Sequence, residues 1–157
     1  MTNRRFCPMF LGLALVMLLP ITAVLGAGGD SDGSSADGLD PIREIIAEGG
    51  YVQAIGELES MDKEDPNNAN VLNLLGYSHR KQGNADEAFR YYDAALQLEP
   101  KHRGANEYLG ELYLETDQLG KAEERLAVLD KECFFPCEEF TDLKAAIKEY
   151  KTQRGVE

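Results

Sequence analysis

From Leu39 onward, apolar residues recur three or four positions apart with polar residues between them, which is the spacing of one face of an α-helix. This pattern recurs in the same register and without gaps in three segments, 49–66, 83–100 and 117–134. The segments start at 49, 83 and 117, so the repeat interval is constant at 34 residues. The aligned apolar or small positions are Ala54, Ala88 and Ala122, then Leu58, Tyr92 and Leu126, then Met61, Ala95 and Leu129. A repeat of this length predicts an array of stacked helical units.

Each repeat has room for two helices of three to four turns, and a helix pair of that size cannot bury its apolar face alone. In the segments before the aligned ones, Leu75-Gly76 recurs as Leu109-Gly110. We expect the two glycines to let paired helices approach closely, while larger side chains fill the space between the helices. The larger side chains are Leu75, Leu109, Tyr92 and Leu126. Pro66 and Pro100 are expected to end the second helix of their units.

Each repeat has an alanine, an aromatic residue or leucine four positions later, and a small or apolar residue three further on, and a proline closes the first two repeats. Together with the constant interval, this pattern resembles the tetratricopeptide repeat family. The resemblance extends over about residues 41–134. It implies an all-α fold, a right-handed α-solenoid of about three helix-turn-helix repeats plus a C-terminal capping helix. The domain would span 39–157, with repeats at about 41–68 (truncated), 69–102 and 103–136 and the capping helix at 138–153.

The ends of the array depart from the repeat. The first helix can begin only near Asp40, which we expect as N-cap with Pro41 in the first turn. In the third unit Asp117 replaces the turn glycine. The capping helix has acidic residues at its start, basic residues at its end and one apolar stripe. That stripe consists of Phe140, Leu143, Ala146, Ile147 and Tyr150.

The N-terminus has the order of a secretory signal peptide. Arg4 and Arg5 precede a short apolar run, which Pro20 interrupts and small residues follow. We therefore expect a signal peptide at 1–26, a flexible Gly/Ser/Asp linker at 27–38, and a periplasmic or secreted protein without a stable membrane span after cleavage. The alternative is anchoring in the inner membrane by an uncleaved signal.

The charge balance excludes one class of partner. Cleavage would remove Arg4 and Arg5 and leave 14 basic residues against 28 acidic ones. Such a surface repels nucleic acid, so we do not expect nucleic acid as a partner.

Two cysteines remain after cleavage, Cys133 and Cys137 in the stretch CFFPC. We favour a structural disulfide in an oxidising compartment, with Phe134 and Phe135 packed under the capping helix. A redox site and half of a metal site are the alternatives, although a metal site needs about four ligands and the chain has two histidines.

His79 is expected to be a buried, hydrogen-bonded core residue and His102 to face solvent. No cofactor is expected.

The resemblance implies a non-enzymatic interaction module in the cell envelope that binds a peptide or partner protein through the groove of the first helices. The groove positions are expected to be Asn70, Asn73, Tyr77, Arg80, Glu107, Glu111 and Leu114. A basic residue of the partner would face Glu107 and Glu111, whereas the cationic clamp of carboxylate-binding relatives is largely missing. Binding through another face, and a thiol-redox or metal-handling protein built on Cys133 and Cys137, are the alternatives.

Overall fold

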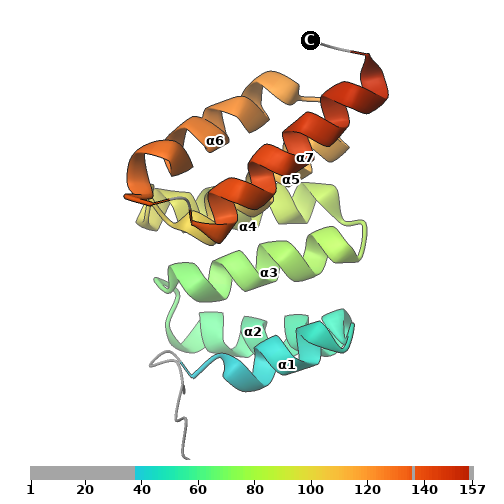
Figure 1. Cartoon of the computed structure of the whole chain (residues 1–157). Helices are drawn as coiled ribbons and strands as arrows, with labels where there is room; N and C mark the ends of the chain where they lie inside the picture. The colour runs from blue at the N-terminus through green and yellow to red at the C-terminus, as the bar shows by residue number, and fades with distance from the viewer. Residues whose placement is uncertain (1–37, 136, 156–157) are drawn as a thin grey trace, which may run out of the picture. The chain divides into compact units, whose positions relative to one another are not determined.

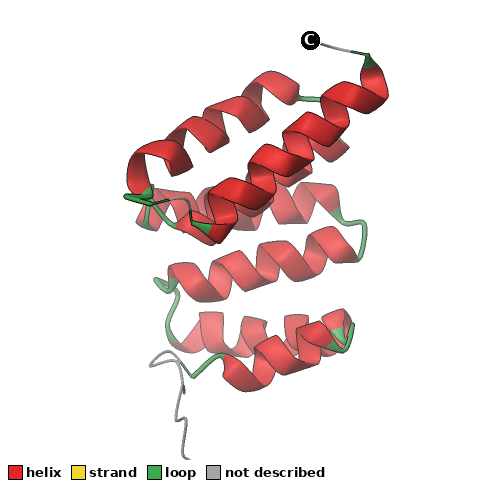
Figure 2. Ribbon diagram, in the orientation of Figure 1, coloured by secondary structure: helices red, strands yellow, loops and turns green. Residues whose placement is uncertain are grey.

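The computed structural model describes residues 38–135 and 137–155, which belong to one compact unit. The predicted signal peptide and all of the predicted linker except Gly38 lie outside the described residues. Within them the chain forms α-helices and no strand (Figure 2). The helices are α1 (Asp40–Ala47), α2 (Tyr51–Glu64), α3 (Ala69–Lys81), α4 (Ala85–Leu98), α5 (Arg103–Glu115), α6 (Leu119–Glu132) and α7 (Glu138–Arg154).

The helices pair in chain order and the pairs stack (Figure 1). Each pair packs internally, as α1 with α2, α3 with α4 and α5 with α6. Successive pairs meet through α2 with α3 and through α5 with both α3 and α4, and α7 covers α5 and α6. The predicted solenoid of three helix pairs with a C-terminal capping helix is therefore confirmed.

The turn inside each repeat needs a left-handed backbone at one position. Gly49, Gly83 and Asp117, which occupy the same position in successive repeats, have φ values of 82°, 78° and 59°. Glycine adopts this conformation without strain, and aspartate is one of the few other residues that tolerate it. The Asp117 carboxylate also accepts a hydrogen bond from Tyr150 Oη at 3.1 Å and pairs with Arg154. The aspartate that replaces the turn glycine at position 117 thus connects the turn between α5 and α6 to α7.

Side chains cap two of the first helices. Asn68 Oδ1 accepts from the backbone N–H groups of Asn70 and Val71 before α3, and His102 Nδ1 accepts from the N–H of Ala105 before α5. At α1 the prediction was wrong by one residue. Leu39 is the N-cap, and Asp40 is the first helical residue, where its carboxylate pairs with Arg43 at 2.9 Å.

The two repeat glycines lie at close contacts between helices, as expected. A Cβ on Gly76 would lie 2.6 Å from the ring of Tyr92, and a Cβ on Gly110 would lie 2.5 Å from Leu143 Cδ2. The second contact connects α5 to α7 rather than to Leu126 of α6. Leu143 follows Leu109 by one repeat interval, so α7 occupies the place of the first helix of a further repeat.

The buried core follows the stacking. One cluster joins α1 to α4 and includes Ala105 of α5, a second joins α4 to α5, and a third joins α5, α6 and α7. Leu39, Leu58 and Leu75 belong to the first, Tyr92, Leu109 and Leu112 to the second, and Leu114, Leu129 and Leu143 to the third.

His79 is not the hydrogen-bonded core residue that was predicted. Its ring stacks on Tyr91 with centroids 5.3 Å apart, and neither ring nitrogen has a hydrogen-bond partner among the described residues. Burial lowers the pKa of His79, which keeps the imidazole neutral in this aromatic contact. An aromatic neighbour therefore occupies the position where a polar partner was expected.

Cys133 and Cys137 are joined as a disulfide with Cα atoms 5.7 Å apart, in the loop between α6 and α7. Phe134 and Phe135 do not pack under α7, because they are 94% and 76% exposed. The space beneath α7 is already filled by its own Phe140 with Leu126, Leu129 and other members of the third cluster. The two phenylalanines instead contact each other edge to face, with centroids 5.1 Å apart.

We expect thiol titration of a purified domain of residues 39–157, without reductant, to find essentially no free thiol under native or denaturing conditions. The double substitution Cys133→Ser with Cys137→Ser should lower the free energy of unfolding by about 2 kcal/mol, because a five-residue loop is no longer closed in the unfolded chain. Partner binding should survive. Two titratable thiols in the untreated protein, or loss of function without loss of stability, would instead favour a redox role.

Candidate functional site: a groove across the first helices

A groove of about 520 Å³ crosses the face formed by α1, α3, α5 and α7, which are the first helix of each pair and the capping helix. Tyr51, the first residue of α2, also lines it. The inner lining from α3 and α5 consists of Asn70, Asn73, Leu74, Tyr77, Gly104, Glu107 and Tyr108. Stacking the repeats therefore brings side chains that lie far apart in the sequence to one surface.

Four of the seven predicted groove residues line this surface: Asn70, Asn73, Tyr77 and Glu107. Leu114 does not, because α5 is covered by α6 and α7 at that point and the side chain is 8% exposed within the third core cluster. Arg80 and Glu111 also lie outside the lining, since they bind each other.

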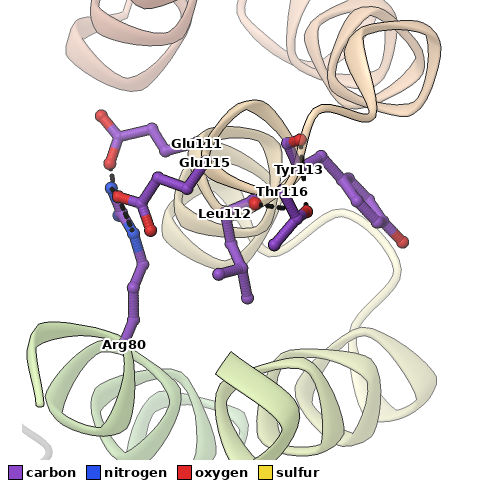
Figure 3. A network of polar contacts seen from close by, with 6 residues as sticks. All are labelled: Arg80, Glu111, Leu112, Tyr113, Glu115 and Thr116. Carbon is purple, nitrogen blue, oxygen red and sulfur yellow. Dashed lines mark hydrogen bonds and ion pairs between the residues drawn. The ribbon is translucent and has the colours of Figure 1, made fainter. Parts of the chain in front are cut away.

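Arg80 ties the last turn of α3 to α5 (Figure 3). Its guanidinium Nε and Nη2 donate to Glu115 Oε1 at 3.0 and 2.7 Å, and Nη1 donates to Glu111. Burial alone would lower the pKa of Arg80, but the two carboxylates more than offset that effect, so the net shift is upward. The structure thus removes Glu111 as a partner for an incoming cation and leaves Glu107.

Glu107 lies on α5 and is 8% exposed. No hydrogen bond or ion pair to its carboxylate is found among the described residues. Burial, followed by the neighbouring carboxylates of Glu111, Asp142 and others, raises the pKa of Glu107 to about 8. A buried carboxylate without a cation is costly to ionise, so this side chain is a candidate for binding a positive group.

Three tyrosines form a row along the groove. The rings of Tyr51 and Tyr77 have centroids 6.4 Å apart, and those of Tyr77 and Tyr108 are 4.8 Å apart. Burial, with a contribution from Glu107, raises the pKa of Tyr108 to about 12, so the phenol stays neutral. Rigid rings of this kind supply large contact area at low entropic cost.

Two asparagines add amide groups. Asn70 Oδ1 accepts a hydrogen bond from His102 Nε2 at 3.0 Å. His102 was predicted to face solvent, but its ring instead hydrogen-bonds to Asn70, and burial lowers the pKa of His102. Asn73 is 7% exposed and its Oδ1 has no hydrogen-bond partner within the described part of the chain. A Cβ on Gly104 would lie 3.1 Å from Asn73 Nδ2, so the glycine makes room for this amide.

Sequence reasoning did not place α7 in the groove. Glu138, Glu139 and Asp142 of this helix line the groove, although their acidic character was first explained by the helix dipole. The signal was present, because Glu138 follows Gly104 by one repeat interval and Asp142 follows Tyr108 by the same interval. Extending the repeat period into the capping helix would have found them.

The described residues contain no group of three or more histidine, cysteine or acidic side chains able to hold a metal ion. Nor do they include a helix that is both long enough and apolar enough to cross a membrane.

Comparison with known proteins identifies the repeat. Residues 79–147 match the sequence profile described as tetratricopeptide repeat. No curated protein matched the chain. Among solved structures, that of the type III secretion translocator chaperone SycD from Yersinia enterocolitica is similar in fold. It has 18% sequence identity and a TM-score of 0.65, over 80% of this chain and 91% of that chain. With its constant repeat interval, its paired helices and this match, the chain carries tetratricopeptide repeats.

Proposed function

We propose that this protein is a non-enzymatic interaction module that binds a segment of a partner protein in the groove of α1, α3, α5 and α7. Tetratricopeptide repeats and a structural neighbour that is a chaperone both support protein–protein interaction as the activity. The observation that carries the proposal is the groove itself, which combines an open row of tyrosines with buried polar groups that have no partner among the described residues.

The groove suits an extended segment or a helix of a partner. Amide groups such as that of Asn73 can pair with a peptide backbone, and Tyr77 and Tyr108 offer rigid apolar contacts. A buried acceptor without a donor is unfavourable in the free protein and gains a partner when a donor binds. Affinity would therefore concentrate in the centre of the groove.

We also propose that the module acts in the cell envelope, as a periplasmic or secreted protein. The support is the leader pattern of residues 1–26 and the cysteine pair, which suits an oxidising compartment. The intact mass of the protein from its native host should correspond to a chain that lacks about 26 N-terminal residues. An intact N-terminus would favour the anchored alternative.

The groove is tested by Tyr77→Ala. Affinity capture with crosslinking and mass spectrometry would first identify a partner, and its affinity would then be measured for each variant. We expect Tyr77→Ala to weaken binding at least tenfold, as loss of a central aromatic contact does. Tyr150→Ala, which removes a half-buried tyrosine of α7 outside the groove, is the matched control. Circular dichroism would verify both folds, and equal affinities of the two variants would disprove the groove assignment.

A further inference from the structure

Four carboxylates, those of Glu107, Glu138, Glu139 and Asp142, line the end of the groove formed by α5 and α7. Within the described chain, only Glu139 of these four has an ion-pair partner, Arg103, whose Nε lies 3.6 Å from its Oε1. Arg80, a buried cation of α3, is already engaged by Glu111 and Glu115. Among the described residues, this end of the groove therefore gathers four carboxyl groups and pairs one of them with a cation.

An independent observation points to a missing donor at the same place. Asn73, on the neighbouring helix α3, is more than nine-tenths buried, lines the groove together with Glu107, and has no partner for Oδ1 in the part that the structure describes. Its amide nitrogen lies next to Gly104 of α5. Asn73 Oδ1 is an acceptor, and the Glu107 carboxyl group becomes a pure acceptor when a cation favours its ionised form.

The surrounding side chains also favour a cation. Tyr77 and Tyr108 line the groove beside these acceptors, and the faces of aromatic rings attract positive charge. Lys81 Nζ already lies 5.2 Å from the centroid of the Tyr77 ring. Leu74 adds an apolar wall for a hydrocarbon chain.

We propose that this end of the groove binds the ammonium group of a lysine side chain carried by the partner segment, with Glu107 as its ion-pair partner and Asn73 Oδ1 as a hydrogen-bond acceptor. The inference rests on the proposed function and names the chemistry of the segment. An ammonium has three donors and no acceptor, which matches a carboxylate, an amide oxygen and one further carboxylate. Its four-carbon stem packs along Leu74 and the tyrosine rings.

The test uses short peptides and does not need the natural partner. Acetyl-Ala-Ala-Lys-Ala-Ala-amide and the same peptide with norleucine in place of lysine would be titrated into the ¹⁵N-labelled domain and followed by NMR. We expect saturable shifts in α3, α5 and α7 with the lysine peptide and none with norleucine. Glu107→Gln should weaken binding of the lysine peptide at least tenfold. Glu124→Gln, which removes an exposed carboxylate of α6 outside the groove, should leave it unchanged.

Equal binding of the two peptides, or equal effects of Glu107→Gln and Glu124→Gln, would overturn the lysine site. That result leaves the proposed function standing if Tyr77→Ala still weakens binding of the captured partner. If the lysine peptide binds through Glu107 but Tyr77→Ala does not affect that partner, the lysine site holds and the assignment of the groove to that partner fails.

Discussion

Replacing Glu107 by glutamine is expected to raise the free energy of unfolding at pH 8 by roughly 1 to 3 kcal/mol and to leave it nearly unchanged at pH 4.5. The folded protein holds the pKa of Glu107 at about 8, above the ordinary value of 4.5. The full shift corresponds to about 5 kcal/mol, which screening at the open side of the groove reduces.

The sign follows from proton linkage. Between pH 4.5 and 8 the folded state retains the proton of Glu107 while the unfolded state has lost it, so stability falls as pH rises through this window. Glutamine cannot ionise, so the Glu107→Gln protein does not lose this stability as the pH rises. Chemical denaturation of both proteins at several pH values gives the difference, with Glu124→Gln as the control for removal of one negative charge. A difference between Glu107→Gln and the wild type that does not change with pH would contradict the assignment.

Gly76→Ala is expected to destabilise the protein by roughly 1 to 3 kcal/mol, although alanine is the better helix former by about 1 kcal/mol. The new Cβ would lie 2.6 Å from two ring carbons of Tyr92, whose side chain is fully buried between helices. Carbon atoms in contact prefer about 3.5 to 4.0 Å, so α3 and α4 would have to separate.

Gly56→Ala is the matched control, because Gly56 lies in α2 and a Cβ there meets nothing within 4 Å. It should stabilise the protein by about 0.5 to 1 kcal/mol. Adding Tyr92→Leu to Gly76→Ala should recover part of the loss, because the repeat has leucine at the corresponding positions 58 and 126. Thermal or urea unfolding measures all of these variants, and a stable Gly76→Ala protein would show that the close contact is unimportant.

The sequence predicted the fold well because repetition makes each structural signal visible more than once. The constant repeat interval located the turn positions at 49, 83 and 117 and the close contact at Gly76. It also predicted Asn73, Tyr77 and Glu107 as groove residues, since helical spacing decides which side of a first helix faces the groove.

The errors arose where contacts depend on neighbouring elements rather than on spacing. Arg80 and Glu111 have groove-facing spacing, but long side chains of opposite charge on adjacent helices bind each other. Leu114 lies where α7 covers α5, and the place expected for Phe134 and Phe135 is filled by Phe140. Such competition for space and charge is decided by tertiary packing, which one helical pattern does not encode.

Site-specific photocrosslinking tests the central claim, that the groove binds a partner protein, most directly. A photoreactive phenylalanine analogue would replace Tyr77 in the groove or, as control, Gln97, an exposed residue of α4 that does not line the groove. We predict that the partner crosslinks from position 77, that the crosslinked peptide contains a lysine, and that position 97 gives no crosslink. Efficient crosslinking from position 97 and none from position 77 would contradict the account.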